Sequence, residues 1–409
     1  MASITNNNIV PSVAMTAQAI DNSDKYGQFL VSCFPLIISF ISPLLAWIIA
    51  MLILAVGSSV LNKTNRRILG LVVIFAGALT IASRQVFESP SDDFARYYAI
   101  YQSLSEGDMA AFFNFGDGFE IILPLLFRAL SFFFSKAEPS LVIFFVSFFC
   151  GLLFLFWLEK YGMKEVEPAK RSLCLATALI FFSFFMTSQL MRQMIAMLLV
   201  LYALYEKNIL TSALFVVMGT AFHLTALPIY IVCKMSFRYP VITFFIVSIT
   251  SLIFVHSFTS ILSLYSGGSL DYIGTGKLLY YTDSTESFTK ADLSLLKYFV
   301  FLIIIYLLIP GRDNVTAKWK YFVLTFSAIY FVFLPLPGAS LRTTLILNSI
   351  LLGYLIFLGL KKYNKVLTAG VVIFIFYRSI RQFIGDENGF DLWNAYDWIG
   401  FPFGYYWIN

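Results

Sequence analysis

Residues 173–205 read LCLATALIFFSFFMTSQLMRQMIAMLLVLYALY and carry one charged side chain, that of Arg192. A helix that crosses the hydrocarbon core of a membrane needs about 20 mainly apolar residues, so the stretch exceeds one crossing, and Arg192-Gln193 interrupts it. About 14 residues follow Arg192 before Lys207, and they span only ~21 Å as a helix. We therefore expect Arg192 to lie below the membrane surface, where it pairs with an acid or lines a wet cavity.

The rest of the chain has the same apolar character. Of its 409 residues, 59% are hydrophobic, 18% are aromatic and 12% are charged. Soluble domains carry about 25% charged residues, and a chain with so many aromatic rings does not stay disordered. The composition excludes both classes and predicts an all-α polytopic membrane protein with about 12 transmembrane helices. The apolar runs are 33–60, 68–86, 140–158, 172–190, 193–206, 209–222, 224–236, 240–262, 293–309, 321–338, 343–360 and 366–384.

One more apolar segment, 119–135, contains Pro124 and Arg128, and we interpret it as a re-entrant or interfacial helix. We expect a single transmembrane domain with two longer periplasmic loops and a periplasmic tail at each end. The predicted divisions are a polar N-terminal tail (1–30), the transmembrane domain (31–384), its loops (87–118 and 263–292) and an aromatic C-terminal tail (385–409).

The distribution of charge predicts which side of the membrane each loop faces. Six loops hold 16 of the 28 basic residues and 5 of the 23 acidic ones, so their net charge is +11 and that of the remainder is −6. Cytoplasmic loops are enriched in Lys and Arg, which places these loops inside and both termini in the periplasm. The six loops are 61–67, 159–171, 206–208, 234–238, 310–320 and 361–365.

Arginines on the opposite side need a separate explanation. The positive-inside bias opposes them there, and burying one in lipid costs roughly 3 kcal/mol. The guanidinium fork suits bidentate binding of phosphate, so these arginines point to an anionic ligand carried by a lipid. Two histidines, and four cysteines inside apolar runs, show no metal-ligand spacing, and we predict neither a metal site nor a nucleic-acid partner. The arginines are Arg84, Arg96, Arg128, Arg192, Arg342, Arg378 and Arg381.

Several polar residues could share a site with these arginines. On a helix, Asp93 would face Arg96 and Tyr97, although a solvated amphipathic helix would show the same pattern. Glu120 opens an apolar helix, where it either compensates the helix dipole or faces a cavity. His223 lies at the tip of a short hairpin, as a bonded core histidine or as a base at a cavity floor.

A second feature on the predicted outer side is Arg342, which follows the sequence Pro335-Leu336-Pro337-Gly338-Ala339-Ser340-Leu341. Breaks in helices at membrane depth are tolerated where they line a cavity. An arginine just beyond such a break is a good candidate ligand for an anion.

The order of these motifs resembles the EpsG-like branch of the Wzy-type polysaccharide polymerases. The resemblance covers roughly residues 68–360. A glycine that often precedes the acidic motif is replaced here by Ser89-Pro90-Ser91, which leaves the choice between Asp92 and Asp93 open. The matching residues are Asp93, Arg96, Tyr97 and Tyr98, then Glu120, then Arg192 and Gln193, then Phe222, His223, Thr225, Ala226 and Leu227, and finally Arg342.

The resemblance implies a membrane glycosyltransferase of GT-C type in the bacterial inner membrane. Such an enzyme polymerises oligosaccharide repeats of O-antigen, capsule or exopolysaccharide that are linked to undecaprenyl pyrophosphate. It transfers the growing glycan, at the periplasmic face, onto the next lipid-linked repeat. The expected partners are this substrate, membrane lipid and a chain-length regulator, and no cofactor is expected.

The implied chemistry assigns roles to residues. The leaving pyrophosphate needs positive charge, which we assign to Arg192 and Arg342, with Arg84 as a weaker candidate. The acceptor hydroxyl needs a base, for which the order of preference is His223, Glu120 and Asp93. The residues expected to bind the acceptor sugars are Arg96, Tyr97, Tyr98 and Gln193.

Two other functions fit the same composition. A flippase for lipid-linked oligosaccharides would place its charges deep in two matching halves, whereas here they favour one face. An O-antigen ligase would use the same donor with a different acceptor, and only the order of the motifs favours the polymerase.

Overall fold

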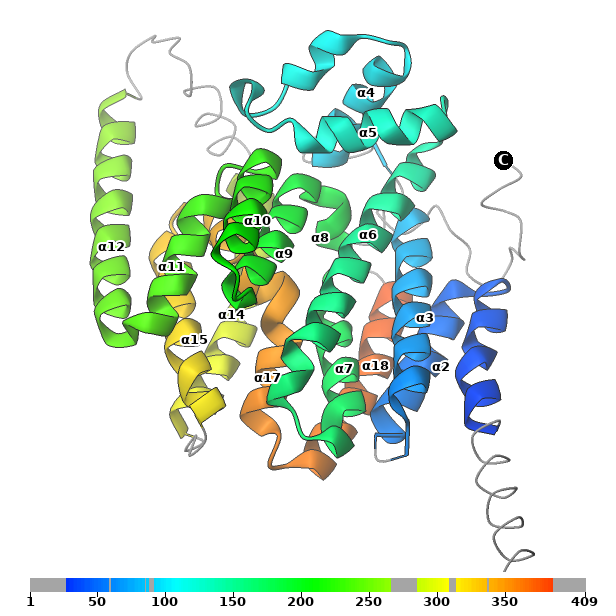
Figure 1. Cartoon of the computed structure of the whole chain (residues 1–409). Helices are drawn as coiled ribbons and strands as arrows, with labels where there is room; N and C mark the ends of the chain where they lie inside the picture. The colour runs from blue at the N-terminus through cyan, green and yellow to red at the C-terminus, as the bar shows by residue number, and fades with distance from the viewer. Residues whose placement is uncertain are drawn as a thin grey trace, which may run out of the picture.

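The computed structural model describes residues 27–58, 60–84, 86–87, 92–265, 285–308, 314–336 and 338–384. Every regular element within these ranges is a helix, which confirms the predicted all-α class. Figure 1 shows upright helices with a smaller helical layer across one end of the bundle. The helices are Gly27–Ser39, α2 (Pro43–Val56), α3 (Lys63–Ala82), α4 (Asp93–Ser105), α5 (Ile122–Phe133), α6 (Pro139–Lys160), α7 (Arg171–Phe181), α8 (Phe184–Gln189), α9 (Met191–Tyr205), α10 (Ile209–Phe222), α11 (Ala226–Arg238), α12 (Pro240–Tyr265), α14 (Thr285–Leu308), α15 (Asn314–Phe333), α16 (Ala339–Thr343), α17 (Leu352–Leu360) and α18 (Asn364–Ile384), with 3-10 turns η1 (Met109–Phe113), η2 (Gly116–Gly118), η3 (Gly162–Glu165) and η4 (Pro168–Lys170) and a π-helix η5 (Ile346–Leu351).

Two of the predicted runs are each broken into two helices. The run 33–60 breaks before α2, because Ser42 caps its N-terminus by accepting a hydrogen bond from the Leu45 N–H, and Pro43 starts the helix. The run 172–190 breaks between α7 and α8, where Ser183 caps α8 and donates its own N–H to the Ser349 carbonyl at 2.9 Å. Local capping thus divides stretches that hydropathy alone reads as continuous.

Three helices are long and apolar enough to cross a membrane, among the residues that the structure describes. They are Lys63–Ala82, Pro139–Glu165 and Pro240–Ser257. Seven shorter apolar helices accompany them, so the protein is a helical membrane protein while the expected number of about 12 crossings stays a prediction.

The layer at the end of the bundle contains α4 and α5, and we call it the cap (residues 92–133). In Figure 1, α5 runs across the axes of the upright helices. Its Leu123 and Phe127 are buried, whereas Leu125, Phe132 and Phe133 are exposed. A helix that is apolar on its outer face suits a membrane interface, and the interpretation of 119–135 as a re-entrant or interfacial helix stays a prediction.

The predicted loops contain helical elements where the structure describes them, and much of the tails lies outside the described residues. Loop 87–118 contains α4, η1 and η2. Of loop 263–292, the first three residues belong to α12 and the last eight to α14, and 266–284 lie outside the described ranges. The same holds for residues 1–26 and for the tail 385–409.

The end of the bundle opposite the cap gathers ion pairs from the predicted cytoplasmic loops. Arg66 binds Glu159 through two hydrogen bonds of 2.9 and 3.0 Å. Glu165 accepts hydrogen bonds from Lys318 and from the phenol of Tyr354, at 3.4 and 2.8 Å. Three loops that the charge rule assigns to one side therefore meet in space.

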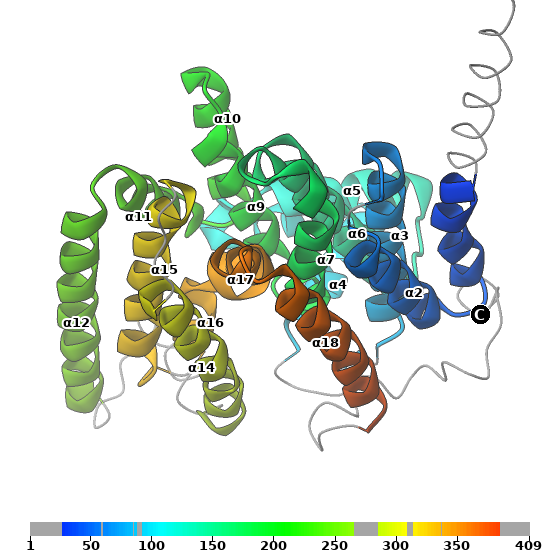
Figure 2. The same ribbon diagram turned by 90° about the horizontal axis from the view of Figure 1, so that it is seen from below.

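Close helix contact sets the centre of the bundle. A Cβ on Gly353 of α17 would lie 1.9 Å from the Thr177 carbonyl oxygen of α7, so only glycine permits this approach. Figure 2, seen from below, shows α17 and α7 next to each other at the middle of the molecule. The π-helix η5, which directly precedes α17, also contacts α7 and α9.

Candidate functional site

Arg192 lies at the outer end of α9, directly below the cap. Its guanidinium sits 3.9 Å from the centre of the Phe115 ring and forms an ion pair with Glu120. The side chain is 16% exposed, so it is shielded from lipid but still reachable. The expectation that a submerged arginine pairs with an acid agrees with this geometry.

Glu120 is positioned by a tight glycine turn. Gly116 has a φ of +54°, and a Cβ there would lie 2.6 Å from the Glu120 Cγ. The Glu120 side chain is 4% exposed. Its Oε2 accepts a hydrogen bond from Arg192, and its Oε1 accepts one from the Leu224 N–H at 3.0 Å. Both carboxylate oxygens are therefore engaged, one by the arginine and one by the tip of the hairpin.

His223 forms the tip between α10 and α11. Its Nδ1 is 3.9 Å from the Glu120 Oε1 and accepts a hydrogen bond from the Thr225 N–H at 3.3 Å. A backbone N–H can only donate, so in the neutral ring the proton resides on Nε2. In this geometry the imidazole is a donor through Nε2.

A second ion pair joins Arg342 to Asp93. The Arg342 guanidinium lies 2.9 Å from the Asp93 Oδ2, and the two side chains are 27% and 32% exposed. Gly338, with a φ of +72°, ends the predicted break and starts the short helix that bears Arg342. Gln193 donates to the Arg342 carbonyl at 2.7 Å, which ties this helix to α9.

Tyr97 lies between the two ion pairs. It is buried, and burial raises the pKa of its phenol against the opposing effect of the positive charge of Arg192, whose guanidinium lies 5.6 Å from the centre of the ring. The charges of Asp93 and Arg342 also act on it, so both pairs share one electrostatic environment. Tyr97 is only 4% exposed, and its predicted contact with an acceptor sugar stays a prediction.

Three predicted site residues have other surroundings. Arg84 is fully buried in a bidentate pair with Asp92, at 2.8 and 3.1 Å, so it can bind a lipid phosphate only by breaking that pair. Tyr98 of the cap donates to the Ala137 carbonyl, in the turn before α6, at 3.0 Å. Arg96 is exposed at the rim, where it donates to the Asn114 carbonyl.

The structure separates the roles of the two neighbouring aspartates. Asp92 caps α4 by accepting from the Phe94 N–H, and it also accepts from Gln189 at 2.8 Å. Asp92 thus fastens the cap, and Asp93 faces the second guanidinium.

The site also contains Phe115, which no motif in the sequence predicts. The Phe115 ring of the cap packs against the Arg192 guanidinium and also lies 5.3 Å from the guanidinium of Arg96. Its only local signal is the glycine turn that follows it. No group of three or more His, Cys, Asp or Glu that could hold a metal occurs among the described residues.

Comparisons with known proteins give one result. The EpsG family matches residues 67–398, about four-fifths of the chain, and thereby confirms the family indicated by the motifs. Neither the comparison with curated proteins nor that with solved structures produced a match. All the residues of the two ion pairs lie within the matched range, and the chain therefore belongs to the EpsG family.

Proposed function

We propose that this protein is a GT-C-type membrane glycosyltransferase that polymerises undecaprenyl-pyrophosphate-linked oligosaccharide repeats of an O-antigen, capsule or exopolysaccharide. The transfer would take place at the periplasmic face of the bacterial inner membrane, and both termini would be periplasmic. Support comes from membership of the EpsG family and from the charge asymmetry of the loops.

One observation carries the proposal. Arg192 and Arg342, both partly exposed, are held by Glu120 and Asp93 at the end opposite the lysine-rich loops. Preorganised guanidinium groups stabilise negative charge that develops on a leaving phosphate. A lipid head group reaches this level of the membrane from the side, so a lipid pyrophosphate suits the position.

The reaction we propose is a glycosyl transfer. The acceptor hydroxyl oxygen forms a bond to the anomeric carbon of the first sugar of the growing chain, and the bond from that carbon to the pyrophosphate oxygen breaks. The lipid pyrophosphate leaves with the electron pair, and the hydroxyl proton passes to a base on the protein. Arg192 and Arg342 neutralise the leaving group, and binding both substrates together supplies proximity.

Among the three candidate bases, the contacts favour Asp93. Both oxygens of Glu120 are engaged, and the His223 Nδ1 already accepts a hydrogen bond. Asp93 is the most exposed of the three, and among the described residues it pairs only through Oδ2, with Arg342. We therefore assign the base to Asp93, the positioning of Arg192 to Glu120, and a hydrogen bond from Nε2 to the pyrophosphate to His223.

The test uses purified protein in detergent with lipid-linked repeats as substrate. A polymerase extends the repeats into a ladder of products, and Asp93→Asn should reduce the rate of ladder formation at least about tenfold. Asp108→Asn is the matched control, since Asp108 is an exposed cap of η1 in the same layer. A flippase requires a sealed membrane and makes no ladder in detergent, and a ligase transfers only to a different acceptor, so either result would contradict the proposal.

A further inference from the structure

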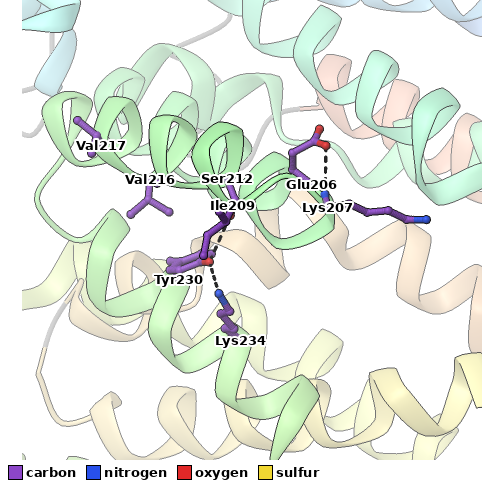
Figure 3. A pocket seen from close by; sticks show the side chains of 9 residues that line it. Glu206, Lys207, Ile209, Ser212, Val216, Val217, Tyr230 and Lys234 are labelled. Atoms are coloured by element: carbon purple, nitrogen blue, oxygen red, sulfur yellow. Dashed lines mark hydrogen bonds between the residues drawn. The ribbon is translucent and has the colours of Figure 1, made fainter.

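A cavity opens between the two arms of the hairpin, at the end opposite His223 (Figure 3). Its volume is about 430 Å³, and it lies between the start of α10 and the second half of α11. The candidate site makes no use of it. The lining residues that matter here are Ile209, Ser212, Val216, Val217, Tyr230 and Lys234.

One wall of the cavity is aliphatic and uncovered. Ile209 is 79% exposed and Val217 is 64% exposed, and both belong to α10. From one to the other the helix rises ~12 Å, most of the ~15 Å depth of one leaflet. In a membrane protein, such a wall faces acyl chains.

The other side of the cavity carries a polar row that ends in a cation. Lys234 donates to the Tyr230 hydroxyl at 2.8 Å, and that hydroxyl lies 3.4 Å from the Ser212 hydroxyl. Figure 3 shows the Lys234 ammonium beside the Tyr230 hydroxyl, and Lys207 at the rim with its side chain directed away. The ammonium thus sits at the mouth of an apolar groove.

The only acid that lines the cavity is already occupied. Glu206 accepts from the Tyr161 phenol at 2.8 Å, which lowers the pKa of this carboxyl, and it pairs with Lys160. Lys207 and Lys234 line this end of the hairpin, and Lys160 of α6 pairs with its Glu206, so these four side chains carry a net charge of +2. The charge rule places it at the cytoplasmic leaflet, whose surface is anionic.

We propose that this cavity binds one anionic phospholipid of the cytoplasmic leaflet. The phosphate lies at Lys234 and Tyr230, and one acyl chain follows α10 from Ile209 to Val217. A lipid between the two arms stabilises the hairpin by linkage, because it binds the folded form.

The test counts lipids bound to the purified protein by native mass spectrometry, during titration with phosphatidylglycerol or phosphatidylcholine. The wild-type protein should retain phosphatidylglycerol in preference to phosphatidylcholine, and Lys234→Ala should weaken the binding of phosphatidylglycerol about fivefold. Adding Lys207→Ala to this variant should weaken the binding by up to about fivefold more. Ala213→Trp keeps both lysines but fills the cavity, and it should remove the bound lipid. The matched control is Lys362→Ala with Lys365→Ala, two exposed lysines of another cytoplasmic loop.

Three results would overturn the proposal. They are equal retention of phosphatidylcholine, unchanged binding to Lys234→Ala, and an equal loss in the control, which would indicate general surface attraction. Thermal unfolding of each variant, with and without phosphatidylglycerol, verifies folding and should show a smaller lipid-induced shift for Lys234→Ala than for wild type. The measurement involves no glycan, so its outcome is independent of the proposed polymerase activity.

Discussion

The pair formed by Glu120 and Arg192 offers the sharpest test of the assigned roles. If Glu120 acts by holding Arg192, replacing Glu120 lowers the rate of ladder formation only while Arg192 is present. If Glu120 is instead the base, replacing Glu120 lowers the rate by the same factor whether or not Arg192 is present. A double-mutant cycle with Glu120→Gln and Arg192→Gln separates the two cases.

The size of the effect follows from the burial of the pair. The side chains are 4% and 16% exposed, so solvent screens the charges little, and removing one partner of such a pair costs about 2–5 kcal/mol. The partial exposure of Arg192 favours the lower part of this range, about 2–3 kcal/mol. An increase of the activation barrier by that amount corresponds to roughly a 30- to 150-fold loss in kcat/KM. In the Arg192→Gln background, Glu120→Gln should change the rate by less than about twofold, because no buried charge is left unpaired.

The assay is the initial rate of ladder formation in detergent, with thermal unfolding to confirm that each variant is folded. Arg67→Gln serves as the control, because Arg67 is 48% exposed and pairs with Glu159 at the opposite end of the bundle. Its effect should be small, as exposed pairs contribute about 0–1 kcal/mol. Equal losses from Glu120→Gln in both backgrounds would refute the positioning role and restore Glu120 as a candidate base.

Three further predictions follow from the remaining contacts. Asp92→Asn should lower the free energy of unfolding by about 3–5 kcal/mol, since it removes the carboxylate from a fully buried ion pair with Arg84. An unchanged unfolding temperature would contradict this. Asp93→Asn should change the free energy of unfolding by no more than about 1 kcal/mol, because the Asp93 carboxylate is one-third exposed. The same variant should reduce the rate of ladder formation at least about tenfold. Arg342→Ala should cause an equal loss of activity without a large change in unfolding temperature. Glu165→Ala should lower the free energy of unfolding by about 2–4 kcal/mol in denaturation, since it removes the acceptor for four donors at the end opposite the cap. A wild-type free energy of unfolding would show that water replaces the carboxylate.

Much of the architecture was readable from local sequence. The helical class, the extents of α9, α10 and α6, and the break before Arg342 all follow from hydropathy, charge and Pro-Gly placement. The divisions at Ser42 and Ser183 were missed, because a single capping serine inside an apolar run does not alter hydropathy over a window of 20 residues.

The sequence by itself determined that this chain enters a membrane as helices, and it indicated that arginines collect on one side. Both properties depend on hydropathy and charge averaged over residues that are close in sequence, so they do not require knowledge of the folded structure. Only the tertiary structure decided the partners, since Arg192 meets an acid 72 residues away and Arg342 meets one 249 residues away. It also decided that Asp92 fastens the cap while Asp93 faces the site, because adjacent positions on a helix point in different directions and packing alone selects which one meets the guanidinium.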